Sequence, residues 1–400
     1  MTTGHTTAAD THASGDGTIR LRDGLRDAVV VFVGVRLAVF ALSAFAGAGL
    51  IPMPADQPAF GPAFPPPSLE PGWHVVFTGT QRQDAMWYLG LATDGYATDD
   101  ASAAFFPLYP SLIRALTWVP GVGPLAAALA ISNAALLGSL VVFHALTRHE
   151  LGDDTEFARR AVRYLAIFPT AFFFLAPYSE SLFLLLCLLA FWWARGDRWG
   201  HAAAASILAA LTRSPGIVLL VALAVEAIDR SRRDGRSPLP RLAAAAATAL
   251  APLGWFAWWQ VRSGDFWAPL DAQRTWSRDA SLPWETIVDA VWHAWRYRTY
   301  WLLDVIVVVL AIVGVMLAIR RIRPAYLVFA GSSILLPLLV PFPDRPLLSM
   351  PRFVAVVFPV AWGYASAVDR RWLPDALVTG TFTAGYALMA ALFIAWLYVF

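Results

Sequence analysis

Long apolar runs recur along the whole chain and restrict what it can fold into. A helix needs roughly 20 apolar residues to cross a bilayer, and nine clear runs approach that length. Apolar residues make up 58% of the chain and charged residues 14%, a balance that a solvated globular surface does not show. We therefore predict an all-α protein, a polytopic bundle of transmembrane helices. The nine predicted spans lie at about 28–50, 122–146, 159–176, 179–195, 239–261, 300–319, 324–341, 352–368 and 374–399.

One further apolar stretch, 200–228, is interrupted by the sequence Thr212-Arg213-Ser214-Pro215-Gly216. Proline and glycine break a helix, and each half is too short to cross a bilayer without tilt or thinning. We interpret the stretch as a broken helical hairpin whose tip reaches the outer half of the membrane. A single interrupted span is the alternative.

Arginine clusters fall at every second boundary between the apolar runs, provided that 200–228 enters and returns on the same side. Short loops retained in the cytoplasm are enriched in positive charge, so these boundaries are expected to be cytoplasmic. The remaining segments then face outward: the long loop 51–121, the turn at 177–180, the tip at Arg213, the Trp-rich loop 263–299 and the segment 342–350. We expect an integral protein of the plasma membrane whose active site faces the extracytoplasmic side.

The polar residues 1–27 are predicted to be a disordered cytoplasmic tail before a single transmembrane domain, 28–400. A net charge of +2 gives no reason to expect a nucleic-acid partner. The single cysteine, Cys187, excludes an intramolecular disulfide, and the seven histidines show no metal-ligand spacing. We expect no metal and no cofactor. The tryptophans of loop 263–299 fit either an interfacial aromatic belt or substrate binding.

A carboxylate, Asp84, stands among aromatic residues in the first outer loop. Trp87 and Tyr88 follow it closely, and a second aromatic block, 105–110, contains Tyr109. One carboxylate can take a proton from an acceptor hydroxyl while aromatic faces stack on pyranose rings, so this loop predicts a glycosyl-transfer site with Asp84 as base. Capping of a helix, or a pair with Arg82, is the structural alternative. The spacing also predicts an amphipathic helix that begins near Asp84 and lies on the membrane.

Three more charged residues belong to outer-side segments. Glu180 lies in a tight turn after Tyr178, where it fits either substrate binding or capping of the next helix. A guanidinium in an apolar segment is costly unless it meets a partner or a wet cavity, and a phosphate would satisfy Arg213 beside the Pro215 break. A salt bridge from Arg213 to Glu180 or Asp84 is the alternative. Similar reasoning makes Arg352, at the start of a late span, a second candidate phosphate ligand.

These motifs, in this order, resemble those of the PIG-V-like mannosyltransferase family, which includes the enzyme adding the second mannose in GPI-anchor synthesis. Together they extend over about 84–353. The chain departs from the family at Pro215, where asparagine is expected. The resembling pieces are Asp84-Ala85-Met86-Trp87-Tyr88 with Gly95-Tyr96, Phe105-Phe106-Pro107-Leu108-Tyr109-Pro110, Ala176-Pro177-Tyr178-Ser179-Glu180-Ser181-Leu182-Phe183, Leu211-Thr212-Arg213-Ser214-Pro215-Gly216 and Ser349-Met350-Pro351-Arg352-Phe353.

The resemblance implies a multi-spanning C-type glycosyltransferase that uses a polyprenyl-phosphate sugar and inverts the anomeric centre on the non-cytoplasmic face. It implies that Asp84 is the catalytic base, with a lipid or glycolipid hydroxyl as acceptor. Combined with the residues above, it places Arg213 and Arg352 on the donor phosphate. The predicted substrate-binding residues are Trp87, Tyr88, Tyr109, Tyr178 and Glu180.

Two other classes of protein remain open from the sequence. A transporter or flippase of a lipid-linked sugar would also carry intramembrane arginine and aromatic residues, but such proteins often show paired half-repeats, and here one helix break is evident. A non-catalytic membrane subunit would explain the bundle without explaining why the polar motifs share one side. Sugar transfer by the purified protein distinguishes these classes from an enzyme.

Overall fold

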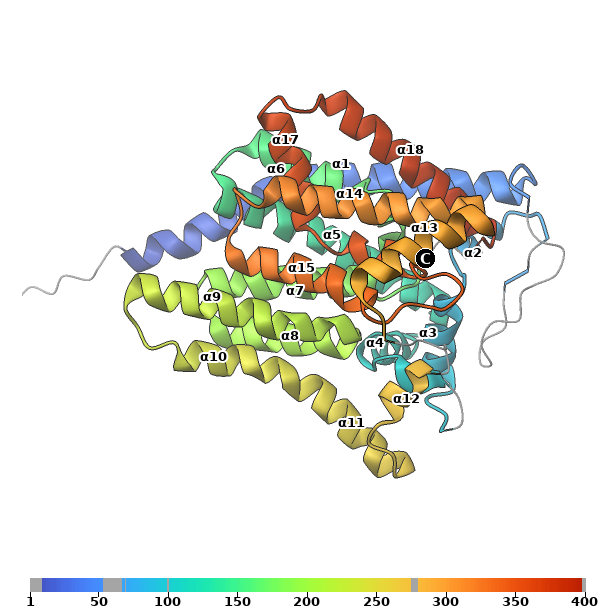
Figure 1. The fold of residues 1–400 in the computed structure, drawn as a ribbon, viewed down its shortest axis with the longest axis horizontal. Helices are drawn as coiled ribbons and strands as arrows, with labels where there is room; N and C mark the ends of the chain where they lie inside the picture. The colour runs from blue at the N-terminus through green and yellow to red at the C-terminus, as the bar shows by residue number, and fades with distance from the viewer. Residues whose placement is uncertain (1–8, 53–66, 69, 99–100, 275–279, 398–400) are drawn as a thin grey trace, which may run out of the picture.

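A computed structural model describes residues 9–52, 67–68, 70–98, 101–274 and 280–397. Helices and short 3₁₀ turns make up its regular structure, and no strand occurs in these ranges, which confirms the all-α prediction. Most of the longer helices run along the long axis of the molecule (Figure 1). Their bounds are α1 Ala9–Gly47, α5 Pro124–Leu151, α6 Thr155–Ala166, α7 Glu180–Arg195, α8 Trp199–Thr212, α9 Val218–Asp234, α10 Leu239–Ala246, α11 Leu250–Ser263, α14 Leu302–Ala318, α15 Pro324–Leu338, α17 Pro359–Asp369 and α18 Asp375–Ile394.

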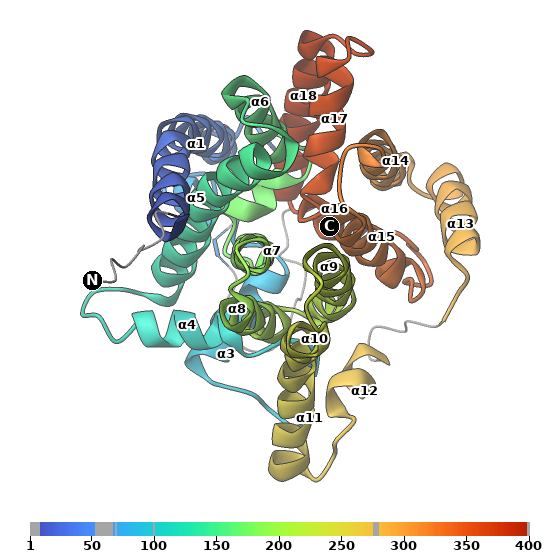
Figure 2. The same cartoon turned by 90° about the vertical axis from the view of Figure 1, so that its left-hand side faces the viewer.

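Helix α7 lies near the middle of the bundle, among α5, α8 and α9 (Figure 2). Its sequence is apolar on all sides, as expected for a helix enclosed by others. Large aromatic side chains fill the space toward α15 and α17: Phe191 contacts Tyr326, and Trp362 stacks on Phe143. The core is therefore continuous across helices that are distant in sequence.

Four helical segments among the described residues are long and apolar enough to cross a membrane: 24–47, Pro124–Leu151, 239–263 and Asp375–Ile394. Helices α8, α14 and α15 are apolar but shorter. The predicted spans 159–176 and 352–368 are each broken, the first after α6 and the second between α16 (Met350–Ala355) and α17. The chain is an integral membrane protein, and the count of nine spans stays a prediction.

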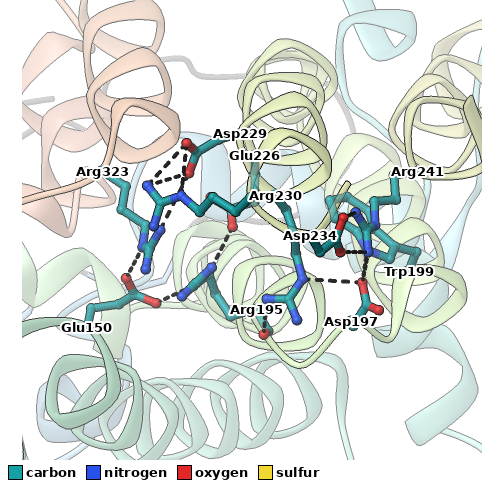
Figure 3. A network of polar contacts seen from close by, with 11 residues as sticks. Glu150, Arg195, Asp197, Trp199, Glu226, Asp229, Arg230, Asp234, Arg241 and Arg323 are labelled. Carbon is teal, nitrogen blue, oxygen red and sulfur yellow. Dashed lines mark hydrogen bonds and ion pairs between the residues drawn. The ribbon is translucent and has the colours of Figure 1, made fainter. Parts of the chain in front are cut away.

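The ends of the predicted hairpin meet, as Figure 3 shows. Arg241, at the start of α10, contacts Asp197, which lies between α7 and α8, at 3.0 Å. Arg230, near the end of α9, donates a hydrogen bond to the carbonyl oxygen of Arg195, at the end of α7. Helices α8 and α9 therefore leave from and return to the same end of the bundle. Gly235 in the left-handed conformation, φ 68°, ends α9.

Ion pairs at this end also join the other arginine-rich boundaries. Arg195 contacts Glu150 of α5 and Glu226 of α9, and Arg323 contacts Glu150 from α15. Further pairs at the same kind of boundary are Arg159–Asp27, Arg163–Asp375 and Arg321–Asp369. We call these residues the arginine layer. They gather at one end, as the alternation along the sequence predicts, while the face of the membrane at which that end lies stays a prediction.

The predicted amphipathic helix on the membrane is wrong. The segment forms two short helices, α3 (Asp84–Thr93) and α4 (Leu108–Leu116). Residues 84–92 are buried, so α3 is enclosed by protein rather than lying on a surface. Only α4 is two-sided, with Tyr109 and Ile113 buried. At the other end of the chain, α1 is helical from Ala9 and so overlaps the predicted tail, whose residues 1–8 lie outside the described ranges.

Candidate active site

Asp84 is the first residue of α3. The preceding residue, Gln83, is fully buried and has φ 43° and ψ −114°, a backbone conformation that turns the chain sharply into the helix. No side chain caps this helix start by a hydrogen bond, and the structure does not pair Asp84 with Arg82. Instead, the Arg82 guanidinium donates to the carbonyl oxygen of Ile394, at the end of α18. Burial lowers the pKa of Arg82 to about 9, so it remains charged near neutral pH.

Arg352 forms an ion pair with Asp84. It lies in α16, which begins after Ser349, a residue in the left-handed conformation with φ 73°. Asp84 and Arg352 are each 8% exposed. A buried charge is tolerated only with a partner of opposite charge, so this pair accounts for the presence of both residues in the interior.

Glu180 and Arg213 form a second ion pair next to the first. Glu180 begins α7, and Arg213 occupies the break after α8. The break is tight: a side-chain carbon at Gly216 would collide with the backbone of Ala210, so only glycine fits there. The structure thus realises the salt bridge to Glu180, the alternative that the sequence left open for Arg213.

The two pairs form one cluster. Arg352 Nε lies 3.8 Å from Glu180 Oε1. The guanidinium carbons of Arg213 and Arg352 lie 5.0 and 5.3 Å from the centre of the Phe353 ring. Two carboxylates and two guanidinium groups balance each other in formal charge. We call Asp84, Glu180, Arg213 and Arg352 the charge cluster. It draws on four distant parts of the chain.

Aromatic residues surround the charge cluster. The Tyr88 hydroxyl lies 2.9 Å from Ser179 Oγ, and the Tyr88 ring contacts the rings of Tyr109 and Tyr178 with centroids 5.0 and 6.3 Å apart. Burial raises the pKa of Tyr88 to about 12, so its hydroxyl stays protonated at neutral pH. The guanidinium of Arg352 lies 5.9 Å from the Tyr178 ring centre.

The remaining predicted substrate-binding residues lie farther from the four charges. The Tyr109 hydroxyl is hydrogen-bonded to Ser132 Oγ at 2.8 Å and donates to the carbonyl oxygen of Ala128. Tyr109 is thereby fixed in place, and its ring packs against that of Tyr88. Trp87 stacks on Phe105 with centroids 5.2 Å apart, and only 6% of it is exposed. One of its faces is therefore occupied by protein. Trp276 of the outer loop lies outside the described residues.

Sequence reasoning missed a further buried ion pair. Asp304, near the start of α14, contacts Arg345 with 2.6 Å between the charged atoms. Arg345 also lies over the rings of Tyr300 and Trp301. A carboxylate inside an apolar span is a signal by itself, and it could have marked Asp304. The pair anchors the segment that leads into Ser349 and α16.

Taken together, the charge cluster offers a carboxylate that can accept a proton and two guanidinium groups that can bind an anionic oxygen. In the described residues no group of three or more His, Cys, Asp or Glu is placed to hold a metal ion. The cluster lies at the opposite end of the bundle from the arginine layer, because α7 runs from Glu180 in the cluster to Arg195 in that layer.

Comparison with known families finds a match for the first part of the chain. Residues 26–231, just over half of the 400, match the model of the family described as Mannosyltransferase (PIG-V). No curated protein matches the chain significantly. The matched region contains Asp84, Glu180 and Arg213, and ends before Arg352.

Proposed function

Because the chain belongs to the mannosyltransferase (PIG-V) family, we propose that it moves mannose from a polyprenyl-phosphate donor to a hydroxyl of a lipid or glycolipid acceptor. Transfer takes place on the extracytoplasmic face and inverts the anomeric centre. The observation that carries the proposal is the ion pair between Asp84 and Arg352 beside that of Glu180 and Arg213. It supplies a base and two cations at one place, within a membrane protein of this family.

Asp84 acts as the base. The acceptor oxygen attacks the anomeric carbon, its proton passes to the Asp84 carboxylate, and the bond from that carbon to the donor phosphate oxygen breaks. The leaving lipid phosphate keeps the electron pair. Proton transfer to a positioned carboxylate typically contributes about 10²- to 10⁴-fold to rate.

The arginines respond to this proton transfer. Before the reaction the carboxylate of Asp84 balances Arg352. Once Asp84 has accepted the proton its charge is gone, so the positive charge of Arg352 is uncompensated while the leaving phosphate gains negative charge. Arg213 adds a second cation, 5.0 Å from the centre of the Phe353 ring that Arg352 also contacts. Preorganised charges are most effective in a site shielded from water, and every member of the charge cluster is at most 8% exposed.

Purified protein in lipid nanodiscs tests the proposal. Incubation with a panel of polyprenyl-phosphate sugars and a lipid extract should give a mannosylated product. Asp84→Asn should lower the rate at least about 10²-fold, and folded protein should still be recovered with a lower Tm, because Arg352 keeps Glu180 at 3.8 Å as a carboxylate partner. Asp94→Asn is the matched control, because Asp94 is an exposed carboxylate at the other end of α3.

Three outcomes would contradict the proposal. Near-normal turnover by Asp84→Asn removes the mechanism. Movement of labelled lipid across the bilayer without product identifies a transporter, and neither activity identifies a non-catalytic subunit.

A further inference from the structure

Gln83 has a buried amide that the mechanism above does not use. The residue is 0% exposed, and neither its amide nitrogen nor its amide oxygen has a hydrogen-bond partner in the described structure. Burying a polar group without a partner is unfavourable, because its hydrogen bonds to water are lost and not replaced. Such groups are uncommon in proteins, and each one calls for an explanation.

The backbone of Gln83 carries a second cost. Its φ of 43° with ψ of −114° is a backbone conformation that residues other than glycine rarely adopt. Strained backbone of this kind is found most often at functional sites. Both costs fall on the residue next to Asp84. A glycine would remove the strain and a leucine the unpaired amide, yet the chain has glutamine.

Trp87 provides another unpaired group in the same turn. Its indole N–H is buried and has no hydrogen-bond partner in the described structure, although its ring is held against Phe105. Gln83 is the residue before α3, and its carbonyl oxygen accepts a hydrogen bond from the Met86 N–H, so Gln83 and Trp87 lie within one turn of the chain. The start of α3 therefore has an unpaired amide on the residue before it and an unpaired indole N–H in its first turn, next to Asp84 of the charge cluster.

The hydrogen-bond donors and acceptors of Gln83 and Trp87 indicate which kind of ligand they can bind. An amide has a donor and an acceptor, and an indole N–H is a donor only. A phosphate at neutral pH chiefly accepts hydrogen bonds, so it would leave the Gln83 oxygen unsatisfied. A hydroxyl both donates and accepts. Arginine suits phosphate better, and two arginines already lie in the charge cluster.

We infer that Gln83 and the Trp87 indole N–H form a hydroxyl-binding subsite that holds ring hydroxyls of a sugar substrate next to Asp84. This inference rests on the proposed function and deepens it, because it assigns sugar recognition to Gln83 and Trp87 at the start of α3 and phosphate recognition to the arginines.

Variants of each group test the subsite in nanodiscs with polyprenyl-phosphate mannose. Gln83→Leu should lower kcat/KM roughly 10- to 100-fold, the effect of two lost neutral hydrogen bonds, while the Tm stays the same or rises because the unpaired amide is gone. Trp87→Phe keeps the ring and removes the N–H, so a loss of roughly 3- to 10-fold is expected. Gln260→Leu is the matched control, since Gln260 is exposed on α11.

Deoxy donors make the test specific. Among donors that each lack one mannose hydroxyl, the donor without the bound hydroxyl should have a kcat/KM about 10-fold below that of the complete donor with the wild-type protein. With Gln83→Leu, that donor and the complete donor should have the same kcat/KM. Unchanged kinetics for Gln83→Leu would overturn the inference, and so would equal losses from every deoxy donor in both proteins. A parallel fall in Tm and activity would assign Gln83 a structural role instead.

A binding assay separates this inference from the proposed function. Methyl α-mannoside at millimolar concentration should raise the Tm of wild type and not that of Gln83→Leu, whereas inorganic phosphate should raise both. If the wild-type protein transfers no sugar, the proposed function is wrong. The difference in mannoside thermal shift between wild type and Gln83→Leu still shows whether Gln83 binds a sugar hydroxyl. A mannoside shift that is equal in both proteins overturns the subsite whatever the transfer result.

Discussion

Asp84 and Arg352 are separated by 268 residues and form a buried ion pair. Each lies in a short helix that begins directly after a residue with positive φ, Gln83 before α3 and Ser349 before α16. Strained residues persist only where the surrounding structure holds them. These two residues set the directions in which α3 and α16 leave the preceding chain. The backbone conformation therefore fixes the relative position of the two charges.

Arg352 contacts Asp84, Glu180 and Ser349 through different guanidinium nitrogens. Arg352→Lys keeps the charge, but one ammonium group cannot reach all three partners. We expect at least a 10-fold loss in kcat with most of the thermal stability retained. Arg352→Met should lower both kcat and thermal stability, because Asp84 is left buried without a partner, at a cost of about 3–5 kcal/mol. Thermal unfolding and initial rates in the same nanodiscs measure the two effects. Wild-type rates for Arg352→Lys would exclude a role beyond charge balance.

Glu180 and Arg213 allow a double-mutant cycle. Glu180→Gln leaves Arg213 without its carboxylate partner, and Arg213→Met leaves Glu180 with only Arg352 at 3.8 Å, so each alone should lower the Tm. The double variant removes both charges, so its Tm should return toward that of wild type. Its activity should stay low, because Arg213 would no longer be present for the donor phosphate. Recovery of both stability and transfer in the double variant would show that the pair is structural only.

The arrangement of the ends of the bundle could be predicted from the sequence, because the position of charge relative to apolar runs is a local property. Arg195, Arg230 and Arg241 gather at one end as the alternation of arginine clusters requires. The choice of partners inside the bundle could not be predicted in the same way. The pairing of Asp84 with Arg352 joins distant segments, and the sequence around either residue does not indicate which residue is its partner.

Local pattern was misleading where tertiary contacts decide. The apolar and polar residues after Asp84 suggested a surface helix, but α3 is enclosed on all sides, and the pattern could not show this. Gln83 stood beside Asp84 in the sequence and carried no signal, because its unusual φ and its unpaired amide exist only in the folded chain. Glu180 with Arg213 was foreseen as an alternative, since an arginine in an apolar segment needs a partner.

Glu226 should affect stability and leave catalysis unchanged. It is 1% exposed and contacts Arg195 at 2.7 Å in the arginine layer, away from the charge cluster. Glu226→Gln weakens a buried charge network that joins α7 and α9, so the Tm should fall by several degrees. The KM and kcat of the folded protein should match wild type. A change in KM would show that the two ends of the bundle are coupled.

Tyr88 should make stability sensitive to alkali. Its pKa is raised by burial from an ordinary value near 10 to about 12. The unfolded chain then loses this proton at lower pH than the folded protein, so the contribution of Tyr88 is complete below about pH 10 and is lost as pH rises through 12. Tyr88→Phe should lose less stability than wild type between pH 10 and 12 in thermal unfolding scans. Identical pH profiles would show that Tyr88 is not buried as described.

The two ends of the bundle should be accessible from opposite sides of the membrane. Cys187 is the single cysteine and is buried, so Cys187→Ala gives a clean background for labelling. Asp94→Cys lies at the exposed end of α3, the helix that Asp84 begins, and Arg236→Cys lies at an exposed position beside Asp197 in the loop after α9. A membrane-impermeant maleimide should label position 94 in intact cells and position 236 only after permeabilisation, because the arginine-rich boundaries are expected to be cytoplasmic. Labelling of position 236 alone in intact cells would place the charge cluster in the cytoplasm. The proposed extracytoplasmic transfer would then be excluded, while the ion pair of Asp84 and Arg352 and the hydroxyl subsite would remain open to the tests above.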